Sequence, residues 1–118
     1  MAVTQQVSTQ IRKKVVKTSW LAMPNGNTGN PETFARYAGR LAVQVFGTFG
    51  AAGSVQIEGS NDGGTTWVVL FDNRGTGAAL TFTAAGLRSL NDVPALVRPN
   101  VTAGDGTTSL NVIITGTL

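Results

Sequence analysis

The chain has 118 residues, a length typical of a single domain. Charged residues make up only 13% of it, about half the ~25% of an average soluble protein, and such a composition argues against a disordered chain. It contains no Cys and no His, so it supplies no disulfide, no thiolate nucleophile and no imidazole base. Ser–His–Asp and Cys–His catalysis are therefore excluded for this chain alone. We expect a protein that is not an enzyme and that uses no metal or cofactor.

The positive charge is concentrated near the N-terminus. Residues 1–20 contain four basic residues and no acidic residue, a charge of +4, whereas the remaining residues contain five basic and six acidic residues, a charge of −1. The four N-terminal cations are Arg12, Lys13, Lys14 and Lys17. Such a basic segment can bind an acidic surface of a protein or a nucleic acid. The alternative is a solvated strand whose lysines discourage pairing at a sheet edge.

The secondary structure of residues 1–23 is ambiguous from the sequence. Apolar residues at positions 3, 7, 11 and 15 have a helical spacing, although neither this period nor alternation by twos is clean. We favour an extended basic arm that runs into a strand over Ile11–Leu21. The first residues lack the apolar region of a signal peptide, and the longest apolar runs are far shorter than a membrane helix requires.

Residues 24–39 are predicted to connect this arm to the body of the protein. The first half of the connection consists largely of Pro, Asn and Gly, which favour turns. Asn30 is placed to cap a single helical turn that starts at Pro31. Phe34 and Tyr37, three residues apart, would then face the body together.

Residues 40–118 form the predicted body and begin with two strand patterns. Over 41–49, apolar side chains occupy alternate positions, with residues 41, 43 and 45 on one face. Residues 55–58 also alternate, which predicts that Glu58 lies on a solvated face. The stretch Ser60–Gly64 is a strong hairpin signal because Asn, Asp and Gly tolerate a positive φ.

The strand that returns from this hairpin, Thr65–Asp72, is apolar on both faces. We therefore expect it either in the centre of a sheet or at an interface, with Trp67 anchored in the core. Leu80 and Phe82 then point inward from a short strand. The irregular stretch that follows is compatible with one helical turn over Ala84–Leu90.

Two strands complete the body. The first, Leu96–Ala103, contains Pro99, which cannot donate a hydrogen bond and so indicates a sheet edge or a bulge. A turn at 104–107 leads to the last strand, whose inward face carries residues 110, 112 and 114. Seven or eight strands at intervals of roughly ten residues predict an all-β, single-domain, two-layer antiparallel β-sandwich that is jelly-roll-like.

No catalytic or metal site emerges from the acidic residues. Asp62 and Asp105 lie in Gly-containing turns that lack the alternating oxygen donors of a calcium loop. Glu58, Asp62 and Asp72 are not expected to face a common substrate, so a carboxylate pair for glycoside hydrolysis is discounted. Trp20, at the end of the basic segment, has three open interpretations: a stacking platform, an anchor in a protein interface, or a plug at one end of the sandwich.

Two hairpin regions carry a family resemblance. Residues 55–67 and 97–112, together with the Gly47–Gly50 turn, resemble small virion structural proteins of tailed bacteriophages, in particular the β-sandwich decoration (cement) proteins of the capsid. The resemblance covers about residues 40–116.

The resemblance implies a non-enzymatic protein that is made in the host cytoplasm and binds the major capsid protein on the outer surface of the virion. It also implies a homo-oligomer, either a trimer or a dimer, and no membrane partner. We expect the residues that contact the partner to be Arg12, Lys13, Lys14, Lys17 and Trp20. On this interpretation residues 1–19 could be deleted, with loss of capsid binding, from a body that still folds.

Two alternatives come from other functional classes. A carbohydrate-recognition module of a phage tail or fibre would need an exposed aromatic platform, for which Trp20 and Tyr37 are the candidates. A nucleic-acid-binding protein would use the four N-terminal cations and show a steep salt dependence. Because the body has no basic stripe that extends this cluster, we do not expect nucleic acid as a partner.

Overall fold

The computed structural model describes residues 3–12, 15–34, 41–72, 77–90 and 93–117, with only the backbone described at 9–12, 15 and 117. These residues form eleven β-strands in two sheets, and no helix occurs among them. The predicted all-β, single-domain sandwich is therefore confirmed, with more strands than the seven or eight expected. Among the described residues no helix is long and apolar enough to cross a membrane.

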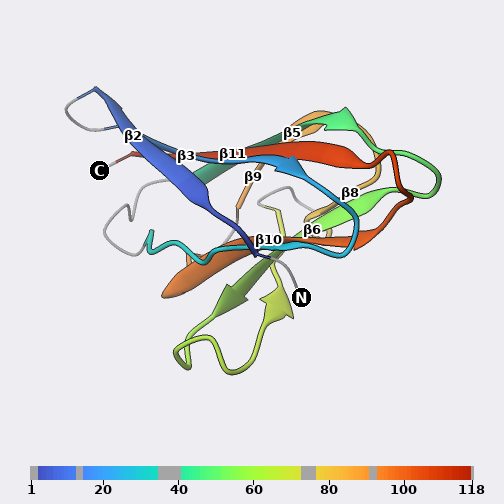
Figure 1. Cartoon of the computed structure of the whole chain (residues 1–118). Coiled ribbons are helices and arrows are strands. Elements are labelled where there is room, and N and C mark those ends of the chain that lie inside the picture. The colour runs from blue at the N-terminus through green and yellow to red at the C-terminus, as the bar shows by residue number, and fades with distance from the viewer. Residues whose placement is uncertain (1–2, 13–14, 35–40, 73–76, 91–92, 118) are drawn as a thin grey trace.

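The two sheets are stacked layers (Figure 1). The six-stranded sheet has, in spatial order, β1 (Val3–Thr4), β4 (Thr28–Gly29), β10 (Leu96–Ala103), β6 (Ser54–Ser60) and β7 (Val68–Val69), while β8 (Thr81–Phe82) also pairs with β6. The five-stranded sheet has the order β2 (Gln6–Arg12), β3 (Val15–Met23), β11 (Ser109–Thr117), β5 (Leu41–Thr48) and β9 (Gly86–Ser89). All pairings are antiparallel except β1 with β4.

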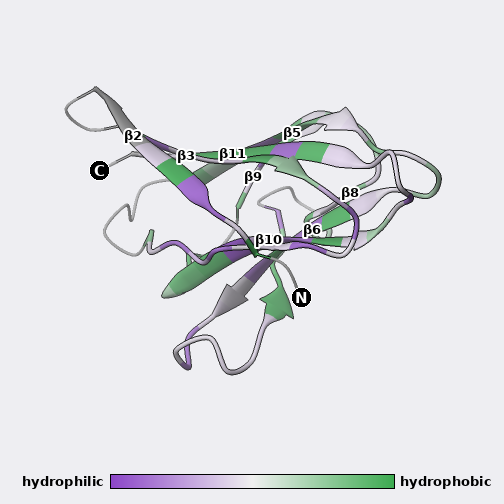
Figure 2. Ribbon diagram, in the orientation of Figure 1, coloured by the Kyte–Doolittle hydropathy of each residue, from purple (hydrophilic) through white to green (hydrophobic). Residues whose placement is uncertain are grey.

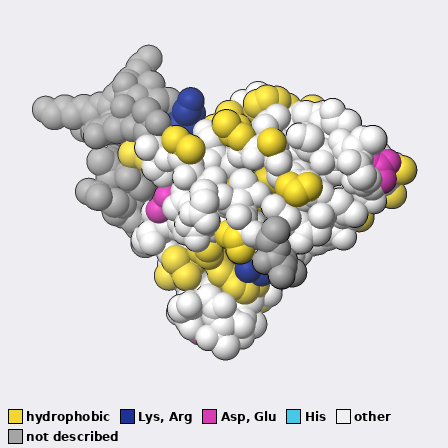
Figure 3. All heavy atoms as spheres, viewed as in Figure 1, with side chains coloured by type: hydrophobic (Ala, Val, Ile, Leu, Met, Phe, Trp, Pro, Cys, Tyr) yellow, Lys and Arg dark blue, Asp and Glu magenta, His cyan; other side chains and the backbone are white. Residues whose placement is uncertain are grey.

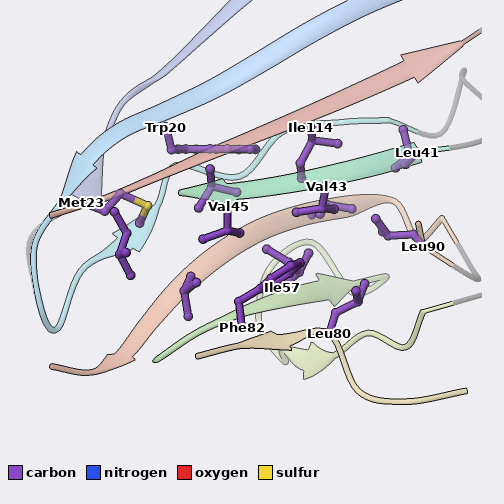
Figure 4. Close-up of a cluster of buried hydrophobic side chains, with 14 of the residues drawn as sticks. Trp20, Met23, Leu41, Val43, Val45, Ile57, Leu80, Phe82, Leu90 and Ile114 are labelled. Carbon is purple, nitrogen blue, oxygen red and sulfur yellow. The ribbon is translucent and has the colours of Figure 1, made fainter. Parts of the chain in front are cut away.

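The core fills the space between the layers. As predicted, alternate residues of β5 and β11 point inward, and the strand register places Val43 opposite Ile114 and Val45 opposite Val112. Both layers contain hydrophobic residues (Figure 2), and their side chains meet in the middle of the molecule (Figure 4). The buried hydrophobic residues are Trp20, Met23, Phe34, Leu41, Val43, Val45, Val55, Ile57, Leu80, Phe82, Leu90, Val97, Val101, Leu110, Val112 and Ile114.

The N-terminal segment is part of the sandwich instead of an arm outside it. β1 joins the six-stranded sheet, and β2 joins the five-stranded one. β3 lies between β2 and β11, so it is an interior strand with a partner on each side. The two lysines at 13–14 lie outside the described residues.

The predicted helical turn after Asn30 is absent from the residues that the structure describes. Glu32 instead forms a bridge with Val97, with backbone N–H···O distances of 2.9 and 3.0 Å. Phe34 is fully buried, as expected. Tyr37 and the rest of the predicted turn lie outside the described residues.

Pro99 occupies an interior strand, where it opposes Ile57 of β6. On the other side of β10, Val97 donates to Glu32 and Val101 donates to Asn27, so the backbone bonds skip the proline, which has no N–H. Gly29 of β4 lies beside it, and a Cβ at this glycine would approach Pro99 Cδ to 2.6 Å. A bulge follows between Val101 and Ala103. Pro99 itself is in regular register, so the prediction that it marks a sheet edge or a bulge was wrong on both counts, and the bulge in this strand comes two residues later.

Two other local predictions need correction. The stretch Thr65–Asp72 has only two strand residues, Val68 and Val69, at the edge of the six-stranded sheet, so a central position was wrong, whereas a position at an interface stays a prediction. The residues proposed for a helical turn over Ala84–Leu90 include β9, which pairs with β5. In both places the tertiary pairing overrides the local pattern.

Candidate interaction surfaces

The basic segment lies on the paired strands β2 and β3. Arg12 is the last residue of β2, and Lys17 lies in β3, opposite Thr115 of β11. The Lys17 side chain is half-buried. Lys13 and Lys14 lie between these strands in sequence and outside the described residues. The structure therefore brings Arg12 and Lys17 to the same strand pair, close to the end of β11.

Trp20 is a core residue. Its side chain is fully buried, and its indole Nε1 donates a 3.0 Å hydrogen bond to the carbonyl oxygen of Asn30. The strand register sets it opposite Val112 on the inward face of β3 (Figure 4). It is therefore neither a stacking platform nor a surface anchor. Burial agrees with the third interpretation, although the structure places Trp20 within the core cluster and not specifically at one end of the sandwich. Of the two aromatic candidates for carbohydrate binding, this one is unavailable to a ligand.

The outer face of the five-stranded sheet is a second candidate surface. One row of residues in register crosses all five strands and alternates apolar with polar side chains: Val7, Ser19, Ile113, Gln44 and Leu87. Phe46, opposite Asn111, belongs to the next row. Hydrophobic side chains are visible over this sheet in the space-filling view (Figure 3). The described side chains of this outer face are Val7, Lys17, Ser19, Leu21, Ala42, Gln44, Phe46, Leu87, Ser89, Asn111, Ile113 and Thr115.

The described side chains of this outer face are nearly all uncharged. Lys17 is the one charged side chain among the residues of the face that the structure describes. The described acidic residues lie elsewhere; Glu32, for example, accepts hydrogen bonds from Ser8 and Gln6, which point to the opposite side of β2. The combination of exposed apolar groups and few charges is typical of the centre of a protein interface.

A groove of about 580 Å³ opens beside the edge of the six-stranded sheet. Its apolar side consists of Val68, Leu70, Val93 and Pro94. Its polar side is formed by Gly59, Ser60, Asn61, Asp62 and Thr66. Val68 lies at the edge of the six-stranded sheet and is exposed. The polar groups have partners within the protein: Asn61 Oδ1, for example, accepts a 2.8 Å hydrogen bond from the backbone N–H of Ala95, which joins the turn to the segment before β10.

The outer side of the six-stranded sheet holds an ion pair. Arg98 Nε lies 2.9 Å from Glu58 Oε1, and its guanidinium stacks on the ring of Trp67 at 4.1 Å from the centroid. Asn100 and Gln56 donate hydrogen bonds to the other oxygen of Glu58. Two predictions were wrong here: Glu58 is only 5% exposed, and Trp67 lies over this ion pair outside the core. The aromatic ring and the cation shield the carboxylate from solvent.

A second ion pair joins two of the short strands. Asp72 is buried, and both its contacts with Arg88, at 2.7 and 3.1 Å, involve Oδ2. Arg88 also donates to the carbonyl oxygens of Thr81 and Ala79 and lies over the ring of Phe82. This arginine therefore holds together segments that have few ladder hydrogen bonds of their own.

The two turn aspartates are hydrogen-bond acceptors within their own loops. Donation by the Thr66 backbone N–H, the Ser60 hydroxyl and the Thr65 N–H lowers the pKa of Asp62 from 3.8 to about 2. The Thr107 hydroxyl and the Ala51 backbone N–H do the same for the pKa of Asp105. In the described part of the chain no three acidic residues gather into a possible metal site.

Comparison with known proteins relates the chain to others by fold. No protein-family model and no curated protein matches it. The crystal structure of the SPBc2 prophage-derived protein YomS is similar, with a TM-score of 0.62 and 14% identity, over 92% of this chain and 100% of that one. At this identity the likeness concerns the fold alone.

Two further structures are much less similar. Peruvianin-I, a cysteine peptidase from Thevetia peruviana latex, has a TM-score of 0.44 and 13% identity, over 88% of this chain and 51% of that one. KdgF from Halomonas sp. has a TM-score of 0.43 and 10% identity, over 96% and 77% of the two chains. Both likenesses are too weak to bear on function.

The outer face and the groove were missed by sequence reasoning. The face depends on which strands become neighbours, because Val7, Phe46 and Leu87 are far apart in sequence. The sequence of β5 did contain a signal for the outer face, because the side of this strand opposite the core carries Phe46 and no charge. The groove combines residues of three segments, 59–62, 66–70 and 93–94, so no local pattern predicts it.

Proposed function

We propose that this protein is a non-enzymatic structural protein of a phage virion that binds the major capsid protein and stabilises the capsid shell as a decoration protein. The sequence resemblance over about residues 40–116 supports it, as does a fold similar to that of a prophage-derived protein. The observation that carries the proposal is the position of the cationic cluster. Arg12 and Lys17 are fixed on paired strands beside an exposed, nearly uncharged sheet face.

The proposed contact uses the four N-terminal cations, Arg12, Lys13, Lys14 and Lys17, against carboxylates on the outer surface of the shell. Because the flanking strands belong to a sheet, binding does not have to order them, and the entropic cost of association is lower than for a free arm. Trp20 contributes to this contact only indirectly, because it anchors β3, the strand that carries Lys17, in the core. The protein would be made in the host cytoplasm and would reach the outer capsid surface by binding there.

Charge removal tests this proposal. The quadruple variant R12Q/K13Q/K14Q/K17Q should lose at least about tenfold in affinity for shells assembled from the major capsid protein of the same phage, because charge-assisted contacts with carboxylates are lost. Binding is measured by co-sedimentation at about 50 mM and about 300 mM salt, and the wild-type protein should bind more weakly at the higher concentration because salt screens exposed charges.

The matched control is the triple variant R36Q/R40Q/R74Q, which also lowers the net charge but leaves the N-terminal cluster intact. It should bind shells as the wild-type protein does. Equal binding by the quadruple variant and the wild type would refute the proposed contact, and equal losses in both variants would reduce it to a nonspecific effect of net charge.

A further inference from the structure

The outer face of the five-stranded sheet has the composition of a contact surface. Its most exposed apolar side chains, which lie on four of the five strands, are Val7 (59% exposed), Leu21 (51%), Phe46 (39%) and Leu87 (64%). The solvated face of an antiparallel sheet is normally polar, and exposed strands often carry charges. Here the described side chains include only one charge, that of Lys17. Burial of this face would remove apolar surface from water at little electrostatic cost.

We propose that this face is the interface of a two-fold symmetric dimer of the chain. Besides apolar groups it presents neutral donors and acceptors, such as Gln44, Asn111 and Thr115, which can pair with the same groups of a second copy. Its one described charge is too little to select an acidic partner, so its composition favours self-association. The dimer does not depend on the proposed capsid function. The two proposed contacts share Lys17, so in the dimer the capsid contact would use Arg12, Lys13 and Lys14, which lie at the end of β2 and directly after it in sequence.

The size of the face fits such a dimer. Five strands about 4.8 Å apart, with a mean length of about 24 Å, give about 600 Å² of sheet per copy. Two copies would bury about 1,200 Å², which reaches the lower limit of specific, stable interfaces. Two sheets that pack face to face, about 10 Å apart, would form the same kind of contact that joins the layers inside each copy.

The strand order determines which residues meet. β11 is the central strand, so a two-fold axis along it lays β2 of one copy over β9 of the other, and β3 over β5. Because Val7 and Leu87 occupy the two ends of one row, Val7 of each copy then contacts Leu87 of the other. In the neighbouring row Lys17 lies over Ala42, so the two lysines are kept apart.

Complementary charges at these two positions test the arrangement. By sedimentation equilibrium the wild-type chain should have about twice the 12.2 kDa mass of one chain. The variants Leu87→Asp and Val7→Lys should each raise the dimer dissociation constant at least about tenfold, because each buries an unpaired charge twice per dimer. An equimolar mixture of the two variants should recover the dimer. In a mixed dimer the substituted positions 87 and 7 face each other as an ion pair, and the second contact is the native one between Val7 and Leu87.

The matched control is Val68→Asp, a substitution at a 58% exposed valine on the edge of the other sheet. It should leave the dissociation constant unchanged. Far-ultraviolet circular dichroism confirms that each variant is folded before its mass is measured. A wild-type monomer at every concentration, a mass of three chains, an equal effect of the control, or a mixture that stays monomeric would overturn the proposal.

Discussion

Arg98 illustrates how a single side chain controls several others. Its guanidinium neutralises the buried Glu58 and covers the ring of Trp67. We expect Arg98→Met to lower the free energy of unfolding by about 2–3 kcal/mol, because a buried carboxylate loses its counter-ion while Asn100 and Gln56 still donate to it. Urea denaturation followed by fluorescence measures this loss.

The double variant Arg98→Met/Glu58→Gln is the control for this prediction. With both charges removed, no charge is left unpaired, so the double variant should be more stable than Arg98→Met alone. If the losses of unfolding free energy in Arg98→Met and in Glu58→Gln add up to the loss in the double variant, the ion pair contributes nothing beyond the packing of its side chains.

The turn aspartates make the stability of the fold depend on acid pH. In the folded state the pKa of Asp62 and that of Asp105 are each about 2, below the ordinary value of 3.8. A lowered pKa means that the ionised form is favoured by folding, so the contribution is complete above pH 3.8 and is lost as the pH falls through about 2. The double variant D62N/D105N should therefore lose less stability over this pH range than the wild type.

Thermal unfolding at several values between about pH 5 and pH 2 tests this difference, because the relevant carboxylates titrate there. Asn retains an oxygen acceptor at each turn, which limits the structural change. If the midpoints of the variant and the wild type fall in parallel as the pH decreases, other carboxylates must account for the acid sensitivity.

At the scale of elements, β3 changes the interpretation of the N-terminal segment. A chain without residues 1–19 would lack β1, β2 and the first half of β3. The lost half of β3 contains the residues that pair with β11 from Ile113 onward. We expect such a chain to lose its cooperative thermal transition, since removal of an interior strand costs more than the roughly 5–15 kcal/mol that stabilises a typical domain. Circular dichroism during heating tests this.

A shorter truncation separates the interior strand from the chain end. A chain without residues 1–5 loses only the two-residue β1 and should keep a cooperative transition. A native spectrum and a sharp transition after removal of residues 1–19 would instead show that β3 is dispensable, as the sequence-based arm hypothesis required.

Elements with a clean period were predictable from the sequence. β5 and β11 alternate apolar and other residues, and both turned out as expected. The N-terminal segment was harder, because lysines interrupt its alternation and the helical spacing of the apolar residues at positions 3, 7, 11 and 15 competes with it. The stretch 65–72 was misread because its apolar residues reflect a groove and an ion pair, which belong to the tertiary structure.

At the scale of the whole molecule, the two layers follow from composition, whereas the surfaces follow from topology. Few charges, many turn signals and short strands were enough to predict a sandwich. The cationic cluster was found in the sequence because its members are adjacent. The nearly uncharged outer face could not be found in this way. Its rows combine residues from both ends of the chain, and only the strand order β2-β3-β11-β5-β9 brings them together.

The central place of β11 has a consequence for biosynthesis. β3 and β5 do not pair with each other, and both wait for Ser109–Thr117 to fill the space between them. During translation the five-stranded sheet therefore cannot close until those residues have left the ribosome, and the nascent chain keeps two unpaired strand edges until then. Premature termination just before residue 109 would remove the middle of a sheet, and chaperones would meet an open polypeptide instead of a slightly shortened native protein.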